Sequence, residues 1–98
     1  MAQPIYKLWQ ARFTEAWYQL SSEERRQRLA QVQGTLDQVG GKMVVICNSD
    51  WSNEQWRVFG VEEFPDIEAV HKHTKLLNEL EWYRYLDSVS TLGTKLEL

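Results

Sequence analysis

The 98-residue sequence contains one cysteine, two prolines and five glycines, and it has no long hydrophobic run. The single thiol, Cys47, has no partner in the chain for a disulfide, which is typical of proteins from a reducing compartment. No apolar stretch approaches the roughly 20 residues needed to cross a bilayer. The first residues also lack the basic-then-apolar pattern of a secretory signal. We therefore expect a cytoplasmic protein that has no membrane partner.

Positive charge is also scarce, because 14 acidic residues outnumber 11 lysines and arginines and the formal net charge is −3. Nucleic-acid-binding surfaces usually carry a basic stripe instead. The one basic cluster, at residues 25–28, directly follows two glutamates and is typical of a solvent-facing helix side. We expect no nucleic-acid partner.

Apolar and aromatic residues are plentiful, since 43 % of the chain is hydrophobic and five residues are tryptophan. A chain of this length is close to the commonest domain size. It buries roughly 60–70 % of its unfolded surface on folding, which is enough for a modest core. We find no repeat and no linker, so we expect residues 1–98 to form a single domain.

The first half of the chain predicts a strand followed by a helix. Apolar residues alternate with a period of two from Ile5 to Phe13, which predicts the strand. Residues 17–20 are then expected in a connecting loop. Ser21, with Glu24 three residues later, is a capping-box pattern and predicts the helix start. The residues of this helix expected to face the core recur at helical spacing and are Leu29, Val32, Leu36 and Val39.

The second half predicts two strands, a helix and a final strand. Met43–Cys47 is a continuous apolar run, which predicts a strand buried on both faces, and Gln55–Phe64 predicts the third strand. Pro65 and Asp66 predict a helix start with Asp66 as the N-cap. The last strand is expected from Tyr83 to about Leu92. The inward face of the second helix is expected to comprise Ile67, Val70, His71, Thr74, Leu77 and Asn78.

Apolar side chains fall on both faces of the predicted strands. Strict alternation places Met43, Val45 and Cys47 on one face, and Val44 and Ile46 on the other. Two helices cover only one face of a four-stranded sheet. Each large apolar side chain left in water costs about 1.5–3 kcal/mol relative to burial, and a contiguous patch usually marks an interface. We therefore expect a homodimer that packs through the open face of the sheet.

The predicted β-α-β-β-α-β order is the ferredoxin-like plan of an α+β protein. The sequence from Phe59 to Val70, FGVEEFPDIEAV, resembles the joint between the third strand and the second helix in the dimeric α/β-barrel superfamily. The aromatic turn at Trp82–Tyr85 is also similar to the turn that precedes the last strand there. The resemblance is closest to a small bacterial family of unknown function.

This resemblance implies a four-stranded antiparallel sheet with two helices on one face, paired into a dimeric α/β barrel. The superfamily includes cofactor-independent monooxygenases, muconolactone-type isomerases, ethyl-tert-butyl-ether-degradation-like proteins and haem-handling enzymes. None of their catalytic or haem-ligating residues maps onto this sequence. We therefore expect no bound cofactor.

One candidate site follows from the third predicted strand. Alternation back from Phe64 places Glu62, Gly60 and Trp56 on the helix side, and a strand glycine leaves space beside it. The predicted helical phase turns His71 toward that space. Glu62 and His71 are thus the candidate catalytic pair for proton transfer, and Trp56 is a candidate ligand-binding residue.

Alternatives remain open for each residue of this site. His71 also fits a hydrogen-bonded position at the core edge, and Glu62 also fits a strand end that reaches water. A bulge near Gly60 would turn Glu62 to the opposite face of the sheet. His71 and His73 are two residues apart on a helix, about 200° around it, and so cannot share a metal ion.

Trp17 and Tyr18 lie in the predicted first loop and are candidate lid residues that bind ligand. Tryptophans also fill small cores and interfaces. We expect a small-molecule-binding homodimer, an oxygenase or isomerase without a cofactor that acts on an aromatic or otherwise unsaturated metabolite. The alternative is a non-catalytic interaction or structural dimer whose aromatic residues only pack. A sizeable closed pocket around Trp56, Glu62 and His71 would favour the first function, and a cavity filled by those same side chains would favour the second.

Overall fold

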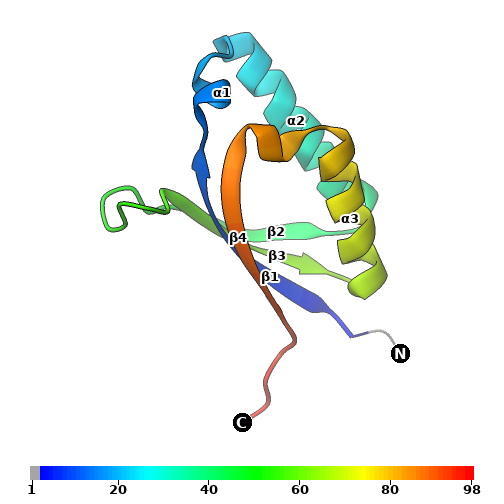
Figure 1. Ribbon diagram of the computed structural model, residues 1–98. Coiled ribbons are helices and arrows are strands. Elements are labelled where there is room, and N and C mark those ends of the chain that lie inside the picture. Colours follow the sequence, from blue (N-terminus) through cyan, green and yellow to red (C-terminus); the bar gives the residue numbers. More distant parts are fainter. Residues whose placement is uncertain (1–2) are drawn as a thin grey trace.

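The computed structural model describes residues 3–98 and contains a four-stranded sheet with helices on one side (Figure 1). Within these residues, no helix is long and apolar enough to span a bilayer. The elements along the chain are β1 (Ile5–Phe13), α1 (Glu15–Tyr18), α2 (Ser22–Gln38), β2 (Lys42–Asn48), β3 (Val58–Phe64), α3 (Ile67–Glu79), the 3-10 helix η1 (Trp82–Arg84) and β4 (Leu86–Gly93).

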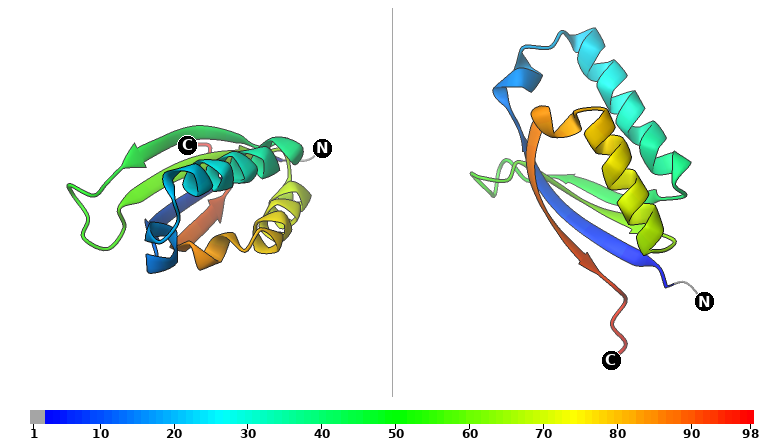
Figure 2. Two further views of the ribbon diagram at one scale, coloured as in Figure 1. Left: turned by 90° about the horizontal axis from the view of Figure 1, so that it is seen from above. Right: turned by 45° about the vertical axis from the view of Figure 1, so that its right-hand side comes forward.

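The sheet has the strand order β2-β3-β1-β4, and every neighbouring pair is antiparallel. Helices α2 and α3 lie on the same face of it, as the view from above shows (Figure 2). This is the ferredoxin-like α+β fold, so the predicted class and element order are confirmed.

Side-chain caps define where the two long helices begin. The Ser21 hydroxyl accepts a hydrogen bond from the Glu24 amide at 3.1 Å, and the Glu24 carboxylate accepts one from the Ser21 amide at 3.0 Å. The Asp66 carboxylate accepts from the Ala69 amide at 2.8 Å. Each cap satisfies an amide that lacks a partner inside its helix. Both predicted helix starts are therefore confirmed.

Strand β1 lies between β3 and β4, and its alternation divides the sheet into two faces. Lys7, Trp9, Ala11 and Phe13 point toward the helices, on what we call the inner face. The intervening residues, such as Leu8, point away from the helices on the outer face. Because side chains alternate with a period of two, pairing with β1 assigns the residues of β3 and β4 to the same two faces.

Strand β2 departs from the predicted alternation. The register shifts between Met43 and Val45, so Met43 and Ile46 share the inner face while Val45 and Cys47 share the outer face. An extra residue in one strand reverses the alternation beyond it, and the predicted grouping of Met43 with Val45 is therefore wrong. β2 is also an edge strand, and its side chains at residues 44–46 are exposed in the single chain rather than buried on both faces.

The buried apolar side chains form two clusters at opposite ends of the helical layer. One cluster joins α1, α3, η1 and the start of β4 to the middle of β1. The other packs Leu36 of α2 against Phe64 of β3 and Val70 of α3. Leu29, predicted to face the core with Leu36, is 48 % exposed, whereas Leu36 is only 2 % exposed. The apolar stripe of α2 is therefore buried at its C-terminal end and not along its whole length.

This difference predicts unequal effects for two matched substitutions on α2. Leu36→Ala should lower the free energy of unfolding by about 2–5 kcal/mol, because it leaves a cavity in the second cluster. Leu29→Ala should lower it by less than about 1 kcal/mol, since half of that side chain already contacts solvent. Urea unfolding of the two variants measures both values. Equal losses would contradict the observed burial of α2.

Candidate functional site

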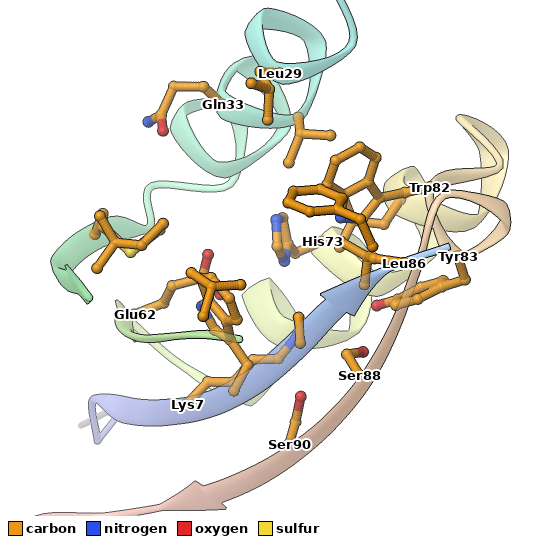
Figure 3. A pocket seen from close by; sticks show the side chains of 18 of the residues that line it. Lys7, Leu29, Gln33, Glu62, His73, Trp82, Tyr83, Leu86, Ser88 and Ser90 are labelled. Atoms are coloured by element: carbon orange, nitrogen blue, oxygen red, sulfur yellow. The ribbon is translucent and has the colours of Figure 1, made fainter. Parts of the chain in front are cut away.

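A cavity of about 540 Å³ lies between the inner face of the sheet and the two long helices (Figure 3). Its volume falls in the range of about 300–1,000 Å³ that is usual for ligand pockets. All four strands, α2, α3 and η1 contribute to its wall, which is mainly apolar. The polar or ionisable residues of the lining are Lys7, Arg26, Gln33, Glu62, His73, Tyr83, Ser88 and Ser90.

Lys7 and Glu62 are neighbours on the floor of this cavity. They are register partners on β1 and β3 and share the inner face, and each is only 8 % exposed. Among residues 3–98, neither takes part in an ion pair within 4.0 Å. Burial lowers the pKa of Lys7 and raises the pKa of Glu62, while their mutual attraction opposes both changes. Each group is thus driven toward its uncharged form.

His73 of α3 borders the same cavity and is 2 % exposed. Its ring lies 5.3 Å from that of Phe64, centroid to centroid. In the described part of the chain, neither ring nitrogen of His73 has a hydrogen-bond partner, and the indole nitrogen of Trp9 also lacks one. Burial, together with the nearby Lys7, lowers the pKa of His73 to about 4. His73 is therefore neutral at pH 7, with one ring nitrogen to donate and one to accept.

The predicted position of His71 is wrong. His71 is exposed, and the buried face of α3 is formed by Ala69, Val70, His73 and Leu77. The prediction placed Ile67 on the inward face, but its side chain is largely exposed and the helix is rotated by about one residue. Because one residue corresponds to 100° of rotation, Val70 takes the inward place expected for His71, and His73 takes the place expected for Thr74.

Strand β3 is oriented as predicted, but the free space that was predicted beside Gly60 is filled. Glu62 faces the helices, so the alternative of a solvated strand end does not apply. A Cβ atom added at Gly60 would lie 2.5 Å from the indole ring of Trp9, which therefore occupies that space. Trp56 precedes β3, and the Arg12 guanidinium lies 5.4 Å from its ring centre. Trp56 is not part of the cavity wall.

Trp17 and Tyr18 also lie outside the cavity wall. They belong to the short helix α1 and not to a loop. Trp17 is buried in the first cluster, stacked on Phe13 at 4.5 Å and in edge contact with Trp82 at 5.8 Å. Tyr18 is 63 % exposed. The lid positions predicted for these two residues are therefore wrong, because aromatic packing draws Trp17 into the core.

Sequence reasoning missed Lys7, Trp9 and His73 as site residues. A signal for Lys7 was present, since it is the one charged residue on the inner face of an otherwise apolar alternating strand, between Ile5 and Trp9. For metals, no group of three or more His, Cys, Asp or Glu residues between 3 and 98 is placed to hold an ion.

The fold and the cavity together define a ferredoxin-like protein with a ligand-sized pocket between its sheet and its helices. Residues 4–98 match the model of a family described as "Family of unknown function (DUF6616)", and the chain belongs to this family. No match is found among curated proteins.

Solved structures with the same fold come from several organisms. A mutant chlorite dismutase from Candidatus Nitrospira defluvii is 15 % identical in sequence, with a TM-score of 0.76. The alignment covers 100 % of this chain and 42 % of the dismutase chain. This chain thus spans less than half of that protein. A protein of unknown function from Rhodopseudomonas palustris is 17 % identical, with a TM-score of 0.72. That alignment covers 100 % of this chain and 86 % of the Rhodopseudomonas chain. A hypothetical protein from Arabidopsis thaliana is 12 % identical, with a TM-score of 0.60. Here the alignment covers 98 % of this chain and 91 % of the Arabidopsis chain. At these identities the similarity shows the fold alone.

The lowered pKa of His73 predicts how stability depends on pH. The unfolded chain binds this proton near pH 6.5, whereas the folded chain binds it only near pH 4. Stability from neutral His73 is therefore present above pH 6.5 and is lost as the pH falls toward 4, by on the order of 3 kcal/mol. Urea unfolding at pH 7 and pH 4 should therefore show a stability loss in His73→Leu that is smaller than the wild-type loss by about this amount.

The matched control is His71→Leu, which changes the exposed histidine of the same helix. It should lose as much stability on acidification as the wild type does. Lys7 and Glu62 are present in all three proteins, so their own titration cancels in the comparison. An equal pH dependence in wild type and His73→Leu would show that His73 is not buried in its neutral form.

Proposed function

We propose that this protein is a small-molecule-binding homodimer whose ligand is an aromatic or otherwise unsaturated metabolite held in the cavity of Figure 3. The observation that carries the proposal is the pairing of an apolar wall with two buried ionisable groups, Lys7 and Glu62, that form no ion pair. Burying ionisable groups that form no ion pair is costly. Their presence is accounted for if a ligand interacts with them.

Glu62 is the proposed proton-transfer residue. Its raised pKa brings it closer to neutral pH, where a general acid or base works best. Removing a proton from carbon leaves an anion that an unsaturated ligand delocalises. Isomerases return that proton to another carbon, and cofactor-independent oxygenases pass electrons from the anion to molecular oxygen. In this proposal His73, and not His71, is the histidine that borders the ligand.

A cavity-filling substitution tests ligand binding. Ser90 lies on the inner face of β4 and lines the cavity, so Ser90→Phe should occupy part of it. In a thermal-shift screen against aromatic and unsaturated acids, alcohols and carbonyl compounds, a ligand at 100 times its Kd should stabilise the wild type by about 2.7 kcal/mol. That stabilisation should be absent from Ser90→Phe.

The control for this test is Thr94→Phe, which adds the same ring in the exposed segment after β4. It should respond to the ligand as the wild type does. If no compound stabilises the wild type, or if Ser90→Phe responds equally, the cavity is not a binding site. The alternative, a structural dimer, would then be favoured.

The homodimer is proposed from the outer face of the sheet. Val45, Val61 and Leu8 are register neighbours and form an apolar row across three strands. Phe59 and Val89 extend this apolar surface on the next row. Between residues 3 and 98, no helix covers that face (Figure 2). A second copy that packs on it across a two-fold axis would bury the same surface on both protomers.

Two leucines of similar exposure on opposite sides of the sheet test this assembly. Leu8, on the outer face, is 45 % exposed, and Leu29, on α2, is 48 % exposed. Leu8→Glu should give a monomer, because it places a charge in the centre of the proposed interface. Leu29→Glu should stay dimeric. Sedimentation velocity distinguishes the two, and a dimer broken only by Leu29→Glu would instead locate the interface at the helices.

A further inference from the structure

Lys7 differs from every other lysine of the chain in its surroundings. It is buried on the inner face of β1, whereas Lys42, Lys72, Lys75 and Lys95 are all exposed. Figure 3 shows its side chain extending along the floor of the cavity toward the serines of β4. A lysine held in such an apolar space is a known setting for amine nucleophiles.

We propose that Lys7 is a nucleophile that forms a Schiff base with the ligand, and that the ligands of this cavity are therefore aldehydes or ketones attached to an aromatic or unsaturated group. This inference rests on the proposed function, because it requires that the cavity admits a small molecule. It adds the functional group that the ligand must carry and the atom to which that group bonds.

The first support is the state of the amine. A protonated lysine is not a nucleophile, and burial favours its neutral form. Glu62 is the one carboxylate whose attraction opposes that effect at Lys7. Because the two side chains make no ion pair within 4.0 Å, Glu62 does not hold the ammonium form by direct contact.

The second support is the set of groups around the amine. Schiff-base formation needs an acid to release water from the intermediate, and Glu62 is the cross-strand neighbour of Lys7. His73 lies on the opposite side of the cavity, with two ring nitrogens that have no partner in the described part of the chain. Lys7 thus has an acid beside it and a second ionisable side chain bordering the same cavity.

The covalent step balances without an oxidant or reductant. The neutral Lys7 nitrogen attacks the carbonyl carbon, the C–N bond forms, and the π electrons pass to oxygen, which takes the proton that the nitrogen releases. The resulting hydroxyl leaves as water with a proton from the Glu62 carboxyl group, and the nitrogen lone pair forms the C=N bond. The net change is one amine, one carbonyl and one carboxyl proton giving one iminium, one water and the Glu62 carboxylate. The iminium then withdraws electrons from the adjacent carbon, which is the carbon that Glu62 would deprotonate in the proposed function.

Reductive trapping with benzaldehyde and cyanoborohydride tests this inference. Reduction of the imine leaves a stable adduct that adds the mass of benzaldehyde less one oxygen atom. Peptide mapping of the wild-type protein should find the adduct on Lys7 at least ten times faster than on Lys72 or Lys75. Benzyl alcohol, which fits the same space but has no carbonyl, should protect Lys7 and leave labelling of the exposed lysines unchanged.

Neighbouring glutamates on opposite faces provide the matched variants. Glu62→Gln should slow labelling of Lys7 by tenfold or more, whereas Glu63→Gln, on the outer face, should leave it unchanged. The inference does not depend on a folded Lys7→Met variant, because the wild-type peptide map already compares the lysines with one another. Where Lys7→Met folds, its labelling should equal that of the exposed lysines alone.

The outcomes separate the two proposals. Selective, alcohol-protected labelling of Lys7 supports both. If benzyl alcohol and benzaldehyde stabilise the protein against heat while labelling spreads evenly over the lysines, the cavity binds ligands but Lys7 is not a nucleophile, and the inference is overturned alone. If neither compound stabilises the protein or protects Lys7, the inference and the proposed binding function both fail for this class of ligand.

Discussion

The indole of Trp9 lies across the backbone of Gly60, its register partner on β3. Any side chain at position 60 would overlap a rigid ring, so this contact holds β1 and β3 in one alignment. Because alternation has a period of two, a slip of one residue would exchange the inner and outer faces of β1. Lys7 would then leave the cavity and Leu8 would enter it. The cavity chemistry and the proposed dimer face therefore depend on the same contact.

The cavity also requires that α2 stays away from the sheet along part of its length. Near its N-terminus, Arg25 donates hydrogen bonds to the carbonyl oxygens of Trp17 and Tyr18, at 3.2 and 2.9 Å. Near its C-terminus, Leu36 packs against Phe64. The turns between these anchors border the cavity. The contacts at both ends of α2 thus offset the free-energy cost of an unfilled interior and of poorly paired polar groups. Such a compensated local cost is typical of functional sites.

Features that depend on neighbours in the chain could be predicted from the sequence. The bounds of β1, the capping box at Ser21 and the N-cap at Asp66 are as predicted, since alternation and side-chain caps act within a few residues. The inward orientation of Glu62 also followed from alternation, counted back from Phe64. From these local patterns and the resemblance at residues 59–70, the ferredoxin-like order could be assembled correctly.

Long-range packing decided the rest. The rotation of α3 that buries His73 and exposes His71 depends on which residues Phe64 contacts, and the helical pattern fits both phases. The bulge in β2 follows from pairing with β3 and not from its own apolar run. Trp17 is buried because Phe13 and Trp82, distant from each other in sequence, enclose it. The sequence by itself thus determined the elements and their order, because caps and periodicity are local. Only the tertiary structure decided which polar side chains meet in one cavity, since that depends on contacts between segments far apart in the chain.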